Sequence, residues 1–116
     1  MQFIVGTDKS SNTTLSKNGV SISITDGKLN RDDNYRLYAN ATMNIKVDAG
    51  KNITKIEFTS TASGTSNYGP SKLSLQGEVG KSSYSGKVTT WTGSSNSVSY
   101  KATAQYRFTK IVVTYE

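Results

Sequence analysis

Two segments of the chain follow one pattern: large apolar, Thr, Lys, Ile, any residue, large apolar, Thr. One is Ile53 to Thr59 (ITKIEFT) and the other is Phe108 to Thr114 (FTKIVVT). In each, the first apolar residue and the Ile are three positions apart, whereas the Ile and the last apolar residue are two apart. Side chains alternate between the faces of a regular strand, so one face cannot hold all three. The pattern predicts a β-bulge at each Thr-Lys step, and paired or symmetry-related places for both segments in one β-sheet structure.

Alternation of apolar and polar residues continues along most of the chain. No stretch has the apolar spacing of an amphipathic helix over three turns. The turn-forming pairs Asn18-Gly19, Asp26-Gly27 and Ala49-Gly50 separate the clearest alternating runs, and we expect chain reversals or corners there. The expected strands are Gln2 to Val5, Val20 to Thr25, Tyr35 to Tyr38, Thr42 to Val47, Ile53 to Thr61, Lys72 to Leu75, Lys87 to Trp91, Ser97 to Ala102 and Ala104 to Tyr115.

Short strands at this spacing predict an all-β domain that spans residues 1–116. The expected architecture is a two-sheet antiparallel β-sandwich, either jelly-roll or immunoglobulin-like. Two stretches, Asn30 to Asn34 and Ser60 to Lys72, are expected to be exposed loops, and the longer second one is the better candidate to carry function. The expected core is Ile22, Ile24, Leu37, Met43, Ile45, Ile56, Phe58, Leu73, Leu75, Trp91, Val98, Phe108, Ile111 and Val113.

The composition favours a β-domain of the extracellular type. Apolar residues make up 34% of the 116 positions, and 17 Ser, 15 Thr and 9 Asn fill turns and outer strand faces. There is no cysteine, which excludes disulfides and thiolate metal sites. No segment has the apolar length of a membrane span, and the first six residues lack the features of a signal peptide. We therefore expect an excised domain of a bacterial surface or secreted protein, or a cytoplasmic protein if Met1 is the native start.

The net charge of +6 permits an acidic partner without requiring one. The 11 Lys and 3 Arg are spread along the chain with no block of adjacent bases, whereas nucleic-acid readers usually cluster them. Solvated strand faces and edge strands protected by Lys explain the charge more simply. A nucleic-acid partner is conceivable and not favoured.

The chain lacks the residues that most catalytic sites use. Without histidine or cysteine, it cannot form a Ser-His-Asp triad, a Cys-His pair or a common zinc site. A pair of carboxylates would remain for hydrolysis, but Asp32 and Asp33 are adjacent and would point to opposite faces of a strand. We expect a non-enzymatic protein without a cofactor. Oxygen ligands between Asp26 and Asn34 could attract calcium, but Lys28 and Arg31 lie among them, so turn capping is favoured and no metal ligand is assigned.

Tyrosines are the best candidates for ligand contact, because a flat ring with a polar end can stack on sugars or bases. Tyr68 lies at the apex of the long loop beside Asn67, and Tyr84 follows Ser82-Ser83, so both are expected to be exposed. Tyr35 precedes Arg36 and adds an aromatic-cationic pair. The predicted ligand-binding residues are Tyr68, Tyr84, Asn67, Tyr35 and Arg36, although tyrosines with buried rings are also normal in sandwiches.

Several segments in order resemble small β-sandwich domains of secreted and surface proteins from gut bacteria, both Bacteroidetes and Clostridia. They are KNGVSI (residues 17–22), YRLY (35–38), ITKIEF (53–58), VTTWTG (88–93), SVSY (97–100) and YRFTKIVVTY (106–115). The likeness covers about Leu15 to Tyr115. It implies an accessory module without catalytic residues, and it carries no known set of functional residues.

Together these observations predict a binding or adhesion module, with a carbohydrate or another cell-surface molecule as its partner. Two alternatives stay open. The chain could be a phage-encoded structural protein of the virion, or a small cytoplasmic inhibitor that binds a protein or nucleic acid through Lys and Arg. The sequence does not decide the oligomeric state.

Overall fold

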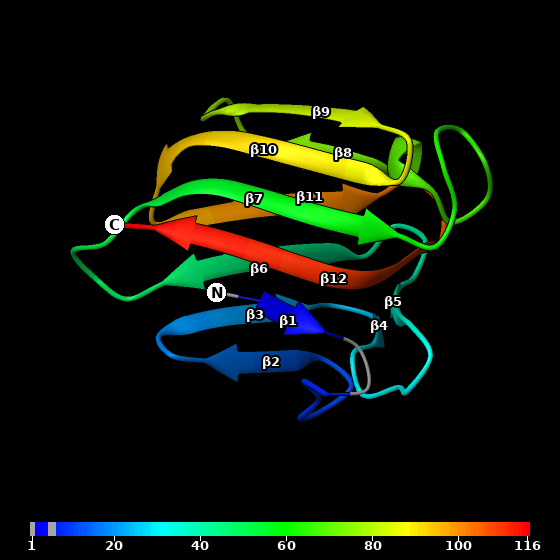
Figure 1. The fold of residues 1–116 in the computed structure, drawn as a ribbon, viewed down its shortest axis with the longest axis horizontal. Helices are drawn as coiled ribbons and strands as arrows, with labels where there is room; N and C mark the ends of the chain where they lie inside the picture. Colours follow the sequence, from blue (N-terminus) through cyan, green and yellow to red (C-terminus); the bar gives the residue numbers. More distant parts are fainter. Residues whose placement is uncertain (1, 5–6) are drawn as a thin grey trace.

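The computed structural model describes residues 2–4 and 7–116, and its strands form two antiparallel sheets packed face to face (Figure 1). The described residues contain no α-helix, and one short 3₁₀ helix, η1 (Pro70–Lys72), precedes β8. The strands are β1 (Gln2–Ile4), β2 (Thr14–Lys17), β3 (Val20–Ile24), β4 (Gly27–Lys28), β5 (Tyr35–Leu37), β6 (Thr42–Val47), β7 (Ile53–Ser60), β8 (Leu73–Gln76), β9 (Lys81–Ser85), β10 (Val88–Ser95), β11 (Ser97–Ala102) and β12 (Tyr106–Tyr115). The predicted two-sheet antiparallel sandwich is confirmed.

The chain passes between the two sheets along the path of a jelly roll. Sheet 1 has the order β4-β5-β12-β7-β10-β9, with β1 also paired to β12, and sheet 2 has the order β2-β3-β6-β11-β8. One arm of the chain runs through β5, β6, β7 and β8, and the returning arm pairs with it in reverse order, as β5 with β12, β6 with β11 and β7 with β10. A fourth pair, β8 with β9, is not formed, because β8 belongs to sheet 2 and β9 to sheet 1. The sandwich is therefore open along this side.

The two repeated sequence segments lie side by side as β7 and β12, the central strands of sheet 1 (Figure 1). Thr109 is the extra residue where Phe108 and Lys110 face consecutive residues of β7, and Thr54 is the extra residue at the other end of the pair. The predicted bulges at both Thr-Lys steps are confirmed. The hydroxyls of the two bulge threonines make equivalent hydrogen bonds. Thr109 Oγ1 donates to the carbonyl of Thr59 (3.4 Å), and Thr54 Oγ1 donates to the carbonyl of Thr114 (3.3 Å). The shared sequence pattern thus corresponds to two strands, β7 and β12, that are related by a local pseudo-twofold axis.

The core fills the space between the sheets. All predicted core residues are buried except Leu73 and Leu75, which are partly exposed at the open side. Aromatic rings form its centre, where Tyr106 stacks on Phe108 at 5.2 Å between ring centroids and Tyr100 meets Phe58 edge to face at the same distance. Further buried residues that the pattern did not assign to the core are Phe3, Leu15, Val20, Leu29, Tyr35, Ala41, Val47, Ile53, Tyr100, Ala102 and Tyr106.

Three strands, β2, β4 and β9, were not predicted. Each lies at a sheet edge, where only one neighbouring strand imposes an alternation of apolar and polar residues. All five residues of β9 are exposed, so this strand has no apolar alternation to detect. The Asn18-Gly19 turn was predicted, and it joins β2 to β3 with both residues at positive φ. The predicted end of the first strand at Val5 lies outside the described residues.

Candidate functional site

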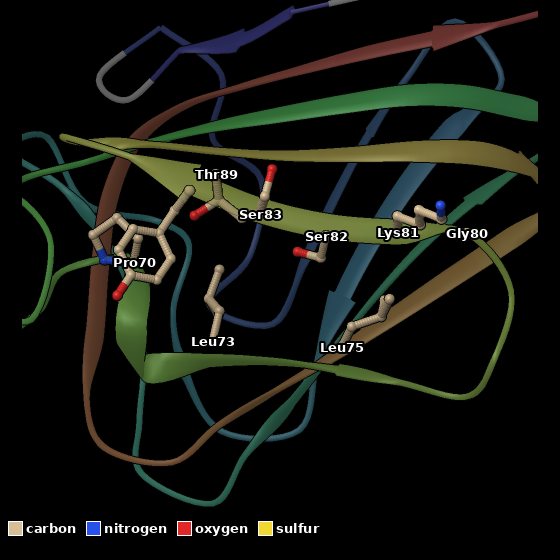
Figure 2. Close-up of a pocket in the computed structure, with 9 residues that line it drawn as sticks. Pro70, Leu73, Leu75, Gly80, Lys81, Ser82, Ser83 and Thr89 are labelled. Carbon is tan, nitrogen blue, oxygen red and sulfur yellow. The ribbon is translucent and has the colours of Figure 1, made fainter.

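The open side of the sandwich holds a groove of about 550 Å³ between the edge strands β8 and β9 (Figure 2). Its position follows from the missing fourth strand pair, because the inner faces of the two sheets separate there. The residues that line it are Pro70, Leu73, Leu75, Gly80, Lys81, Ser82, Ser83, Tyr84 and Thr89. Small-molecule sites in proteins usually have volumes of about 300–1,000 Å³. The groove is thus of suitable size for a small ligand or a segment of a longer one.

One wall of the groove is apolar. Leu73 and Leu75 are the cross-strand partners of Ala102 and Tyr100, which are buried, so both leucines leave β8 on the inner face. Figure 2 shows Leu73 directed toward Thr89 and Ser82 of the other sheet and Leu75 toward Lys81, with Pro70 at one end of the groove and Gly80 and Lys81 at the other.

The opposite wall combines a tyrosine ring with hydroxyl groups. Tyr84 of β9 is the direct cross-strand partner of Thr89 of β10, and Ser82 is the partner of Trp91. The buried state of Thr89 and Trp91 assigns Tyr84 and Ser82 to the inner face of sheet 1. Tyr84 nevertheless remains 46% exposed, because no side chain of sheet 2 covers it fully.

The base of the groove contains an unsatisfied hydroxyl. Thr89 is only 2% exposed, and its Oγ1 has no hydrogen-bond partner among the described residues. The hydroxyl of Tyr106, which is close to Ser60 and Thr89, is also buried without a partner there. Its burial raises the pKa of Tyr106. A buried polar group without a well-formed hydrogen bond costs about 1–3 kcal/mol. The hydroxyls of Thr89 and Tyr106 lie close enough to interact weakly with each other, and both are closed to solvent.

Trp91 and Tyr100 stiffen the groove. Tyr100 OH donates to Ser82 Oγ at 2.7 Å, which ties β11 of sheet 2 to the edge strand of sheet 1. Burial raises the pKa of Tyr100, and this hydrogen bond opposes the rise. The Trp91 indole Nε1 donates to the carbonyl of Val79 at 3.3 Å, and Gly80 packs on the ring. The β8–β9 turn is therefore fixed to the core beneath it.

The predicted binding residues do not form one cluster. Tyr84 lines the groove, whereas Tyr68 lies in the loop before η1 and its ring packs against Arg107, with the guanidinium carbon 3.8 Å from the ring centroid. Asn67 is exposed beside it. Arg36 is on the outer face of sheet 1, opposite Arg107 on the neighbouring strand. The neighbouring strands β5 and β12 thus bring Arg36 close to the Tyr68 loop, with Arg107 between them.

The expectation for Tyr35 needs correction. Its side chain is fully buried and its ring lies 5.3 Å from that of Phe108, so it offers no face to a ligand. Its hydroxyl donates to the carbonyl of Asp8 at 2.5 Å. Burial, and secondarily the negative charge of Asp8, raise the pKa of Tyr35. The alternation Tyr35-Arg36-Leu37 in β5 explains the error, because Tyr35 and Leu37 point inward and Arg36 outward.

The sequence signal for the groove was partial. Tyr84 was identified from its polar flanks, but Thr89, Ser82 and the leucines carry no motif. Their proximity depends on β8 and β9 belonging to different sheets.

Several acidic residues form ion pairs with Lys or Arg of the same chain. Asp33 accepts two hydrogen bonds from Arg31, at 2.9 and 3.0 Å, and these lower the pKa of Asp33 to about 2. Asp32 pairs with Lys9. Across residues 2–4 and 7–116, no three Asp or Glu side chains gather as metal ligands would.

No helix among the described residues has the length and apolar character needed to span a membrane. A scan against protein-family models and a search of curated proteins gave no match to this chain.

Proposed function

We propose that this chain is a non-catalytic carbohydrate-binding module that holds a saccharide in the groove between β8 and β9. The observation that carries the proposal is the pairing of Thr89 and Tyr84. A buried hydroxyl without a partner lies directly across the strand pair from a tyrosine that is 46% exposed. A sugar ring offers both complements, because its C–H face packs on an aromatic ring and its hydroxyls donate and accept hydrogen bonds.

Each wall has a distinct part in the proposed binding mode. The Tyr84 ring stacks on one face of the sugar, and Leu73 and Leu75 contact the edge of the opposite face. Thr89 Oγ1 is closed to solvent, so it bonds to a sugar hydroxyl, directly or through one water, only when the side chains that cover it move on binding. Lys81 supplies a further polar contact at the end away from Pro70, and Ser82 supplies one between the two ends. The hydrogen bond between Tyr100 and Ser82 keeps the two sheets at a fixed separation, which limits the ordering cost of binding.

The setting that we propose is the surface or the secreted fraction of a bacterium. The many Ser, Thr and Asn residues on outer strand faces and the absence of cysteine are compatible with it. In this setting the module would attach a larger protein, or the cell that carries it, to a glycan.

A glycan array probed with the labelled protein tests the proposal, and binding to the selected oligosaccharide is then quantified by calorimetry. Tyr84→Ala should weaken binding at least about tenfold, and Tyr84→Phe should retain most of it because the ring is kept. Ser85→Ala is the matched control, since Ser85 is exposed on the same strand and does not line the groove. A silent array, or equal effects of Tyr84→Ala and Ser85→Ala, would falsify the proposal.

A further inference from the structure

A row of three cations crosses the outer face of sheet 1, on the strands farthest from the groove. Lys28 of β4 is the direct partner of Arg36 of β5, and Arg36 is the direct partner of Arg107 of β12. Their neighbours in each strand are buried, so all three side chains leave the sheet on the same side. Adjacent strands are about 4.8 Å apart, which sets the spacing of the row.

A glycine makes this row possible. Gly27 has φ of 155°, and a Cβ at this position would lie 2.1 Å from the carbonyl oxygen of Arg36. Only a glycine allows β4 to approach β5 closely enough to place Lys28 beside Arg36.

The two guanidinium groups are held in the same way. Arg36 Nε donates to Oδ1 of Asn34 at 3.0 Å, and Arg107 Nε donates to Oε1 of Gln105 at 2.7 Å. In each case a neutral amide two residues earlier orients the group through Nε and leaves the charge uncompensated. The Tyr68 ring packs on one side of the Arg107 guanidinium, with 3.8 Å between the guanidinium carbon and the ring centroid.

No carboxylate neutralises the row. Within the described part of the chain, no Asp or Glu oxygen lies within 4.0 Å of a side-chain nitrogen of Lys28, Arg36 or Arg107. Like charges directly opposite each other on neighbouring strands are destabilising. Oriented, unpaired guanidinium groups in this arrangement match the oxygens of an anionic group, which they can bind in a bidentate manner.

We propose that Arg36, Arg107 and Lys28 form a second binding site, which takes an oxyanion group, sulfate or carboxylate, carried on an acidic glycan. Arg36 and Arg107 bind the oxygens of one such group, and Lys28 adds charge at the edge of the sheet. The site is on the outer face of sheet 1, so it does not require that the groove bind sugar.

The aromatic content of the site favours a glycan over a nucleic acid. Binding of single-stranded nucleic acid combines a basic surface with exposed rings on which bases stack. The aromatic side chain known to contact this row is Tyr68, and the guanidinium of Arg107 already covers one face of its ring. Among the described residues no second ring stacks on a cation of this row, so charge and hydrogen bonds are its main means of binding.

The test measures binding of the whole chain to four polymers by biolayer interferometry at several salt concentrations. Heparin carries sulfate, polygalacturonate carries carboxylate, dextran is neutral, and single-stranded DNA carries phosphate. We expect binding to one or both acidic glycans, weaker binding to DNA and none to dextran. R36Q/R107Q should weaken glycan binding at least about tenfold and reduce the salt slope by about two. K46Q/K101Q is the matched control, because it removes two exposed charges from sheet 2, and it should change the affinity by less than about threefold.

R36K/R107K separates charge from geometry and serves if the glutamine variant is poorly folded. It keeps the net charge but lacks the planar fork, so binding should still fall several-fold. The proposal is overturned if wild type binds neither acidic glycan, if K46Q/K101Q weakens binding as much as R36Q/R107Q, or if DNA binds as tightly and depends on the same arginines. Tyr84→Ala should leave this binding unchanged, so failure of this site and failure of the groove are distinguishable.

Discussion

The turn between β8 and β9 gives a sharp test of the packing beneath the groove. Gly77 and Gly80 are in the same turn and have nearly the same positive φ, 85° and 79°. A Cβ at Gly77 would meet nothing within 4 Å, whereas one at Gly80 would lie 2.5 Å from the Trp91 ring. The two alanine variants therefore share the backbone cost and differ in the contact with Trp91.

The expected magnitudes follow from this difference. An alanine in the left-handed region costs about 1–2 kcal/mol, which applies to both variants. Gly80→Ala must also displace a fully buried ring, and such overpacking adds about 1–3 kcal/mol. A chain of this length has an unfolding entropy of about 0.24 kcal/mol/K, so Gly80→Ala should melt about 4–12 °C below Gly77→Ala.

Calorimetry and tryptophan fluorescence measure the effect. Trp91 is the sole tryptophan, so the emission spectrum reports on this ring alone. Gly80→Ala should shift the emission and Gly77→Ala should not. Equal melting temperatures with unchanged emission from both variants would show that Gly80 does not pack on Trp91 as described.

Three further predictions concern other parts of the molecule. Thr89→Val removes an unpartnered hydroxyl without changing side-chain volume, so it should raise the free energy of unfolding by about 1–3 kcal/mol and weaken sugar binding, whereas Thr90→Val on the outer face should do neither; a destabilised Thr89→Val would refute the unpaired state. In a carboxyl-detected NMR titration Asp33 should protonate near pH 2, and Arg31→Gln should raise that midpoint toward the usual value. Because the pKa of Asp33 is lowered in the folded protein, the ion pair stabilises the fold above the ordinary Asp pKa, and this stabilisation is lost as the pH falls toward 2. An unchanged midpoint in Arg31→Gln would exclude the ion pair. Leu15→Ala should cost about 2–5 kcal/mol in denaturant unfolding although β2 is an edge strand, because Leu15 is 2% exposed; a cost below about 1 kcal/mol would contradict its burial.

Much of the fold could be predicted from apolar spacing, because central strands face the core on one side. The repeated segments predicted the two bulges, since any other phase would place Ile56 or Ile111 in water, and they left open whether β7 and β12 are paired or only symmetry-related; the structure shows them paired. The edge strands β2, β4 and β9 gave no such signal. β9 consists of Lys, Ser and Tyr residues that are all exposed, and its register is set by pairing with β10 alone.

The candidate site could be predicted only where a single residue suffices. Tyr84 was identified from its exposed flanks, but Thr89 became notable only when its hydroxyl was found buried without a partner. Tyr35 was misassigned because the sequence shows its cationic neighbour and not the face on which each side chain points. The Arg36–Arg107 pair brings together residues 71 positions apart, so only the strand order reveals it.

The measurement that tests the central proposal most directly is an amide NMR titration of ¹⁵N-labelled protein with the oligosaccharide that the array selects. The groove model predicts that the largest shifts fall on residues of β8, β9 and the start of β10, with Tyr84 and Thr89 among them. Saturable shifts confined to other surfaces, with Tyr84 and Thr89 unmoved, would contradict it.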